Sequence, residues 1–215
     1  GVSAWLVVCA CGHARRGGLE AVLAWLWTSV AWIAAAGVVL GEIGQLHGQG
    51  FLLAHVVGLA VIGLARRKHL RTDWAALTAL GAPRYDHAPP LPGERAVRIA
   101  LLAVLAGMLV LAALAEPVVY DALTYRLPRI GAWLQDARIH LLAATDPRPN
   151  YMKVAPDLVM AWLWTPTAVG YQGSILAQAI GGVLTLGATV GRARQTGLNR
   201  RAAWLAGALL FGMAN

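Results

Sequence analysis

The chain has 215 residues, of which 58% are hydrophobic and only 13% are charged, and its mean hydropathy is +0.59. This composition lies well outside the average of soluble proteins, so it excludes an ordinary soluble domain and indicates an integral membrane protein. The formal net charge is +8. Because the basic residues gather between apolar runs, membrane topology explains this charge, and we expect no nucleic-acid partner.

The N-terminal part of the chain contains two apolar runs of spanning character. A helix needs about 17–25 mostly apolar residues to cross the hydrocarbon layer of a membrane. Residues 21–41 carry no charge, and residues 51–65 have His55 as their one polar interruption, with uncharged residues before them that extend the run. A further apolar run, residues 2–11, starts the chain. We therefore expect residues 1–65 to form N-terminal transmembrane helices.

The basic residues predict the orientation, because Lys and Arg concentrate in short cytoplasmic loops. They form three groups, at residues 15–16, 66–71 and 192–201. Placing all three groups in the cytoplasm makes residues 66–98 a cytoplasmic loop. Its prolines, Pro89, Pro90 and Pro92, interrupt any helix and favour a connector.

Three more apolar runs follow, at residues 99–115, 170–191 and 202–215. The alternation of spans places the segment between the first two of them, the outer loop 116–172, on the extracytoplasmic side. The last run reaches the end of the chain without a flanking charge. We therefore expect residues 99–215 to be the start of a transmembrane unit that is truncated at its C-terminus.

The outer loop contains two predicted helices. Apolar residues recur at helical spacing over residues 130–141, which predicts an amphipathic helix along the membrane surface with Trp133 at the interface. Residues 156–164 form a short apolar helix that begins with a proline and is too short to cross. The predicted fold is an all-α polytopic transmembrane bundle with two juxtamembrane helices in a large extracytoplasmic loop.

Residues 121–129 read Asp-Ala-Leu-Thr-Tyr-Arg-Leu-Pro-Arg and are followed by Trp133. This motif, the surface helix, the short proline-initiated helix and a span leading to Arg-x-Arg together resemble the GT-C superfamily of polytopic glycosyltransferases, over roughly residues 99–215. The resemblance implies transfer of a sugar, with inversion, from a polyprenyl-phosphate donor to an extracytoplasmic acceptor. It also implies a location in the cytoplasmic membrane, with the active face outside the cell.

The resemblance implies that Asp121 is the catalytic base. A partly desolvated carboxylate at the end of a span has a raised pKa and can take a proton from an acceptor hydroxyl or amine. The alternative is a solvated Asp that caps the helix starting at Ala122. Many relatives carry paired acidic residues here, whereas Tyr120 precedes Asp121 and Glu116 lies five residues back. We therefore expect no metal, and we expect no other cofactor.

The candidate substrate-binding residues are mostly cationic, since guanidinium groups suit phosphate oxygens. Arg126 and Arg129 bind either the carrier phosphate or lipid head groups. Asp146, Arg148 and Lys153 form either part of a solvated loop or a binding site for the sugar donor or the acceptor. Tyr125 and Trp133 are either interfacial anchors or sugar platforms. The substrate-binding candidates are Tyr125, Arg126, Arg129, Asp146, Arg148 and Lys153.

Two other classes of function compete with the enzyme. A multi-span transporter or lipid permease has similar spans and basic loops but places ionisable groups near mid-membrane, where this chain has only His55. A non-enzymatic membrane assembly subunit would use the outer loop for docking. The spacing in Cys9-Ala-Cys-Gly-His13 matches neither a haem attachment site nor a complete zinc site. The sequence leaves the sugar, the acceptor and the oligomeric state open, and we expect the fragment alone to be inactive.

Overall fold

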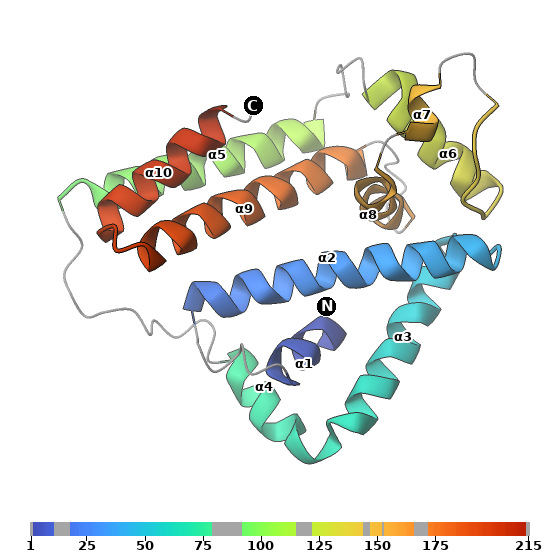
Figure 1. Cartoon of the computed structure of the whole chain (residues 1–215), viewed down its shortest axis with the longest axis horizontal. Helices are drawn as coiled ribbons and strands as arrows, with labels where there is room; N and C mark the ends of the chain where they lie inside the picture. Colours follow the sequence, from blue (N-terminus) through green and yellow to red (C-terminus); the bar gives the residue numbers. More distant parts are fainter. Residues whose placement is uncertain are drawn as a thin grey trace. The chain divides into compact units, whose positions relative to one another are not determined.

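The computed structural model describes residues 2–10, 18–78, 92–114, 122–143, 147–151, 153–165 and 172–213, and all regular elements in these ranges are helical (Figure 1). The elements are α1 (Val2–Ala10), α2 (Gly18–Glu42), α3 (Gly48–Ala65), η2 (Arg67–His69), α4 (Leu70–Thr78), α5 (Glu94–Leu114), η4 (Ala122–Arg126), α6 (Leu127–Gln135), α7 (Arg148–Tyr151), α8 (Val154–Trp164), α9 (Gln172–Gln195) and α10 (Arg200–Met213). The all-α class predicted from the sequence is confirmed for these residues.

Two of these helices are long and apolar enough to cross a membrane. They are Ala21–Glu42 within α2 and Gly48–Ala65, which is α3. Both correspond to predicted spans, and α3 gains its extra length at Gly48, as expected from the uncharged residues before Phe51. The later apolar runs are also helical. Helix α5 has 21 residues and α9 has 24, and α9 carries Arg192 and Arg194 in its last turn.

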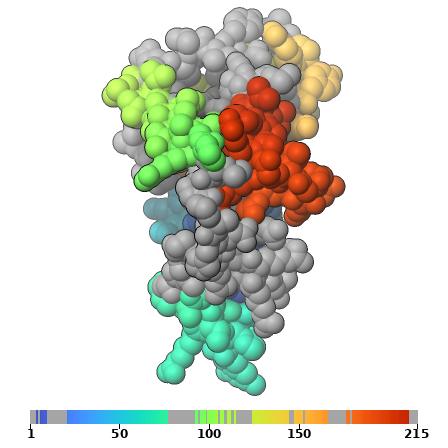
Figure 2. Space-filling model, turned by 90° about the vertical axis from the view of Figure 1, so that its left-hand side faces the viewer, coloured from blue at the N-terminus to red at the C-terminus, as the bar shows by residue number. Residues whose placement is uncertain are grey.

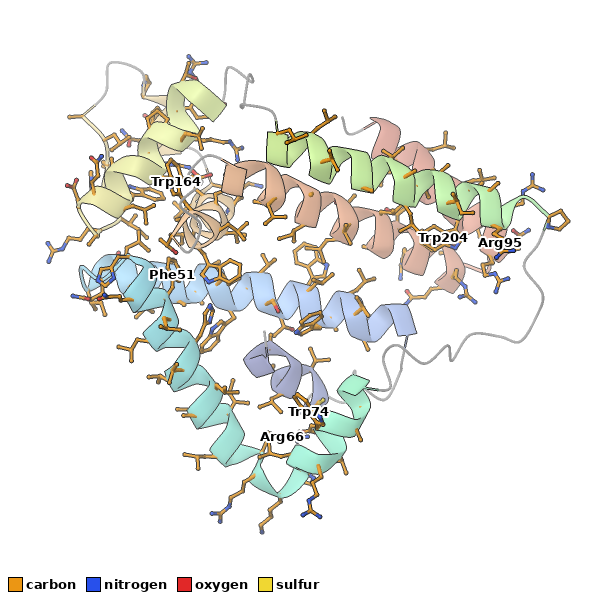
Figure 3. The ribbon with its side chains drawn as sticks, turned by 180° about the vertical axis from the view of Figure 1, so that it is seen from behind. Phe51, Arg66, Trp74, Arg95, Trp164 and Trp204 are labelled. Atoms are coloured by element: carbon orange, nitrogen blue, oxygen red, sulfur yellow. The ribbon has the colours of Figure 1, made fainter. Side chains whose placement is uncertain are left out.

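The predicted cytoplasmic loop 66–98 is partly helical, because α4 occupies residues that were expected to be a connector. Arg66 donates from Nε to Oδ2 of Asp73 at 3.0 Å and from Nη2 to Oδ1 at 2.8 Å. This pair closes the turn between α3 and α4 (Figure 3). Pro89 and Pro90, on which the connector prediction rests, lie outside the described residues.

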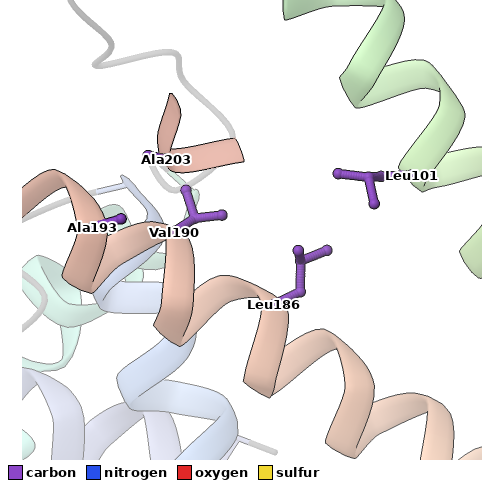
Figure 4. Close-up of a cluster of buried hydrophobic side chains, with 5 residues drawn as sticks. All are labelled: Leu101, Leu186, Val190, Ala193 and Ala203. Carbon is purple, nitrogen blue, oxygen red and sulfur yellow. The ribbon is translucent and has the colours of Figure 1, made fainter. Parts of the chain in front are cut away.

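The chain divides into two compact units, and each draws on segments from both sides of residues 66–98. The first comprises residues 1–28, 62–110 and 179–215. Its main core lies where α5, α9 and α10 meet (Figure 4). The residues of this core are Leu101, Leu186, Val190, Ala193 and Ala203, with Val97, Trp204 and Ala208 packed against them.

Small residues bring the helices of this first unit close together. A Cβ at Gly207 would lie 2.8 Å from side-chain atoms of Leu186 and Val190, and one at Gly187 would lie 2.6 Å from Leu23. Neither position has room for a larger side chain without movement of its neighbours. Gly187 and Gly207 therefore allow close helix packing.

The second unit comprises residues 29–61 and 111–178 and contains η4, α6, α7 and α8. Ile130 of α6 packs on Met160 and Ala161 of α8, and partly buried Leu134 and Trp164 complete this contact. The short helix predicted at residues 156–164 is confirmed as α8, with Pro156 in its first turn, where a proline costs no internal hydrogen bond.

The amphipathic helix predicted to reach Leu141 is shorter than expected, because α6 ends at Gln135. Ala137 has a φ of 53°, and the N–H of Arg138 donates to the carbonyl of Trp133 at 3.0 Å. A left-handed residue followed by this longer hydrogen bond is a Schellman ending. The stripe therefore breaks at Ala137, and Leu141, which was expected to be on its apolar face, is 77% exposed.

Candidate functional site

A single carboxylate lies at the centre of the second unit. Asp157 belongs to the first turn of α8, where the helix dipole favours a negative charge. Its side chain is fully buried, and the two residues after it, Leu158 and Val159, are buried apolar side chains. An ionised carboxylate in such a position requires cationic or hydrogen-bonding partners.

Arg129 of α6 supplies the main partner. Its side chain is 2% exposed, and its Nη2 donates to Oδ2 of Asp157. The same guanidinium donates from Nη1 to the carbonyl of Pro149, and its Nη2 lies 3.4 Å from the carbonyl of Lys153. One buried side chain therefore links α6 to α8 and to the segment between them.

The surroundings of Arg129 also shape its electrostatics. Burial, and then the nearby charge of Arg126, lower the pKa of the Arg129 guanidinium from its ordinary value. Its Cζ atom lies 4.9 Å from the centroid of the Trp133 ring, which provides a favourable electrostatic contact for the cation. Because arginine remains charged at neutral pH, Arg129 and Asp157 form a buried ion pair.

Arg126 approaches the same carboxylate from the other side. Its Nη1 atom lies 3.6 Å from Oδ1 of Asp157, and 33% of its side-chain surface remains exposed. Arg126 is the last residue of η4, a π-helical turn that runs directly into α6. Such turns are frequent at functional sites. Arg126 therefore has a guanidinium that is anchored on one side and open to solvent on the other.

Two more cations lie in the segments that adjoin this pair. Arg148 begins α7, and its Cζ atom lies 5.6 Å from the centroid of the Tyr125 ring. Lys153 is exposed and directly precedes α8. Asn150 fixes the loop beside them, because its side chain accepts from the N–H of Leu142 at 2.9 Å and donates to the carbonyl of the same residue at 3.0 Å.

The structure thus brings most of the predicted site residues into one group of segments around Asp157. These residues are Tyr125, Arg126, Arg129, Arg148 and Lys153. The predicted base Asp121 and the binding candidate Asp146 lie outside the described residues. Asp121 directly precedes η4 in the sequence, so it belongs to the same stretch of chain as Arg126.

Tyr125 and Trp133, predicted as interfacial anchors or sugar platforms, are buried inside the second unit. Both side chains are only 2% exposed. The indole N–H of Trp133 donates to the carbonyl of His140 at 2.8 Å, and arginine side chains lie over both rings. Packing within the unit accounts for these aromatics, because the ring faces are already covered by protein.

Asp157 was not among the predicted site residues, although the sequence contains a signal for it. It is the one acidic residue in the otherwise apolar helix Val154–Trp164. A charge in such a helix is usually paired when it is buried. What the sequence could not indicate was the partner, since Arg129 precedes Asp157 by 28 residues.

A second polar contact lies along α3. The indole N–H of Trp32 donates to Nδ1 of His55 at 3.0 Å, which assigns the proton of a neutral ring to Nε2. The His55 ring also meets Trp162 edge to face, with centroids 5.8 Å apart. Gly58 permits this arrangement, because a Cβ there would lie 2.3 Å from the Trp32 ring. His55 thus takes part in helix packing.

Within the described ranges, no group of three or more His, Cys, Asp or Glu side chains is placed to hold a metal ion. Cys9 is a free cysteine, while Cys11 and His13 lie outside those ranges. Comparison of the chain with protein-family models, with curated proteins and with solved structures finds no match.

Proposed function

We propose that this chain is part of a polytopic membrane glycosyltransferase that moves a sugar from a polyprenyl-phosphate donor to an extracytoplasmic acceptor. The observation that carries the proposal is the partly exposed Arg126 guanidinium beside the buried pair of Arg129 and Asp157. Arg148, over the Tyr125 ring, and the exposed Lys153 lie in the adjoining segment. These cations come from the loop whose sequence resembles the GT-C superfamily. A phosphate leaving group requires such positive charge.

The membrane location of the proposal is supported by two helices that are long and apolar enough to span, α2 and α3. Helices α5 and α9 add two further predicted spans. With the basic groups in the cytoplasm, the outer loop 116–172 faces the outside of the cytoplasmic membrane, where the polyprenyl-phosphate sugar is presented. Donor and acceptor then meet at the segment that holds the cations.

In the proposed reaction, an acceptor hydroxyl or amine attacks the anomeric carbon of the donor sugar. A new bond forms from the acceptor oxygen or nitrogen to that carbon, and the bond from the carbon to the phosphate oxygen breaks. The acceptor proton passes to the carboxylate of Asp121, and polyprenyl phosphate leaves with the electron pair. Attack from the side opposite the phosphate inverts the configuration of the sugar.

The arginines have different parts in this proposal. Arg126 presents a partly exposed guanidinium to the phosphate oxygens, and Arg148 and Lys153 add charge from the adjoining segment. Arg129 is a positioning residue, because its guanidinium is occupied by Asp157 and two carbonyl oxygens. Developing charge on the leaving phosphate is stabilised most by groups that are already in place before reaction.

The first experiment compares sugar transfer by the full-length protein that contains this chain and by its Asp121→Asn variant. Membranes that contain equal amounts of each protein are supplied with labelled polyprenyl-phosphate sugars. We expect at least a hundredfold loss of transfer, in the range typical for a general base. Undiminished transfer would remove Asp121 as the base. It would also support the assembly-subunit alternative if an associated enzyme proved responsible for the transfer.

A transporter or lipid permease is the second candidate, and the polar contact of His55 with Trp32 inside α3 favours it. Ionisable groups within spans often mark transport pathways. The Trp32 hydrogen bond supplies another explanation, because it satisfies Nδ1 of His55 by packing alone. Substrate uptake into vesicles distinguishes the candidates: a transporter loses uptake in His55→Ala, whereas the glycosyltransferase keeps its transfer rate within severalfold.

A further inference from the structure

The turn between α3 and α4 carries a group of exposed cations outside the site described above. Arg67 and Lys68 lie in η2, and Arg71 lies in the first turn of α4. All three side chains are exposed, and no acidic group that the structure describes pairs with them. Arg66 differs, because Asp73 binds it through two hydrogen bonds. The net charge of this turn is therefore strongly positive.

Helix α4 turns apolar residues outward beside these cations. Its Asp73 is buried and its Ala76 packs on α1 in the cluster around Val8, so this face is covered by protein. Leu70 and Trp74 of the same helix are 40% and 57% exposed. Figure 3 shows Arg66 and Trp74 at this corner, and in Figure 2 the blue-green side chains around it project outward.

The position of the corner matches the depth of lipid head groups. The candidate span α3 ends at Ala65, and Leu64 just before its end is 70% exposed. The three residues of η2 advance the chain by about 6 Å. The headgroup layer on each side of a bilayer is roughly 5–8 Å thick. If α3 spans, the cations lie at the level of the phosphates, and Leu70 and Trp74 lie near the acyl boundary.

We propose that the α3–α4 corner, formed by Arg67, Lys68, Leu70, Arg71 and Trp74, binds anionic phospholipids of the membrane leaflet that it faces. The cations bind the phosphodiester and the head-group charge, and the two apolar side chains contact the upper acyl chains. The two hydrogen bonds between Arg66 and Asp73 hold α4 against the end of α3, so the backbone of the corner is fixed. This inference rests on the membrane placement in the proposed function but not on sugar transfer.

Native mass spectrometry of the full chain, released from detergent, measures the proposal directly. The protein is equilibrated with equal amounts of phosphatidylglycerol and phosphatidylcholine that have the same acyl chains. We expect preferential retention of phosphatidylglycerol. The triple variant Arg67→Gln, Lys68→Gln, Arg71→Gln should reduce that preference by on the order of tenfold or more, because each surface cation contributes a factor of about five.

The matched control removes the same charge elsewhere. Arg192→Gln, Arg194→Gln and Arg201→Gln also change three exposed arginines, at the turn between α9 and α10. The control should lower the preference less than the α3–α4 triple variant does, because the turn between α9 and α10 exposes no tryptophan in the described residues that could contact the acyl chains. The single change Lys68→Gln should lower the preference severalfold, which keeps the test informative if the triple variant folds poorly.

Three results would overturn the proposal: no lipid preference in the wild type, equal losses in both triple variants, or displacement of phosphatidylglycerol by inorganic phosphate at equal concentration. Equal losses would mean that overall charge determines the lipid preference. Displacement by inorganic phosphate would mean that the corner binds free phosphate. Sugar transfer does not enter the measurement. A failure here therefore leaves the proposed enzyme untouched, and a failure of Asp121→Asn to alter transfer leaves the lipid site untouched.

Discussion

The described residues of each unit contain a hydrogen-bonded arginine–aspartate pair, and the two pairs differ mainly in burial. In the second unit, the side chains of Arg129 and Asp157 are 2% and 0% exposed. In the first unit, those of Arg66 and Asp73 are 22% and 6% exposed. Burial lowers the pKa of Arg129, whereas the hydrogen bonds that Arg66 donates to Asp73 raise the pKa of Arg66. Desolvation is therefore costly for the Arg129–Asp157 pair, whereas the charged form of Arg66 is stabilised by its hydrogen bonds to Asp73.

This difference indicates separate roles. A buried pair is weak evidence for net stability, because desolvation offsets much of the attraction, but loss of one partner is severe. Arg129 contacts three segments of the second unit, so its pair organises that unit around the candidate site. Arg66 and Asp73 lie only seven residues apart and fix one local turn. The Arg129–Asp157 pair holds the candidate site together, and the Arg66–Asp73 pair holds the turn between α3 and α4.

The largest effect is expected for Asp157→Ala. It leaves the Arg129 guanidinium buried without its carboxylate, which costs about 3–5 kcal/mol. For a chain of this size, the midpoint of thermal unfolding in detergent should fall by on the order of 10 °C. Asp136→Ala is the control, since the Asp136 side chain is 61% exposed, and it should shift the midpoint by less than about 2 °C. Equal shifts in the two variants would show that burial does not separate the two carboxylates.

A double variant sharpens this comparison. Arg129→Met combined with Asp157→Leu removes both charges and keeps comparable volume. Because a buried pair can be replaced by apolar groups at small cost, the double variant should regain part of the stability that Asp157→Ala loses. Recovery should be incomplete, since the carbonyls of Pro149 and Lys153 lose their donor. A double variant no more stable than the sum of its single changes would mean that the two charges do not act as a pair.

The smallest effect is expected for Asp73→Asn. The Asp73 carboxylate is buried, but the Arg66 side chain is 22% exposed and can be hydrated when that charge is lost, so the change should cost about 1–2 kcal/mol. The difference from the wild type should shrink further when the salt concentration is raised, because salt screens exposed charges. Thermal unfolding in low and high salt measures both effects. A loss as large as that of Asp157→Ala would place the two pairs in one class and contradict the comparison.

The sequence predicts some regions well because their physical signal is local. Long uncharged runs predicted α2 and α3, and the proline-initiated apolar run predicted α8. Helix α6 was predicted too long because its apolar stripe continues past the point where a left-handed Ala137 ends the helix. That conformation usually requires glycine, so an alanine at this position does not predict a helix end.

The candidate site shows the same division between local and distant signals. Five of its residues were predicted from the motif and charge of the outer loop, and they are Tyr125, Arg126, Arg129, Arg148 and Lys153. Their arrangement around Asp157 was not predictable, because the central pair joins residues 28 positions apart. Helix α4 was missed for a related reason: the bond of Arg66 with Asp73 and the packing of Ala76 stabilise a segment of weak apolar pattern.

The central claim is that cations held around Asp157 act on a donor phosphate, and sugar transfer by Arg126→Gln tests it most directly. Arg138→Gln is the matched control, because Arg138 is an exposed arginine of the same unit with no contact to Asp157 among the residues that the structure describes. Both proteins should unfold within about 2 °C of the wild type. We predict that Arg126→Gln reduces transfer by roughly ten- to a hundredfold, consistent with loss of one charge-assisted contact to the leaving phosphate, while Arg138→Gln stays near the wild-type rate. Equal transfer by the two variants would contradict the claim.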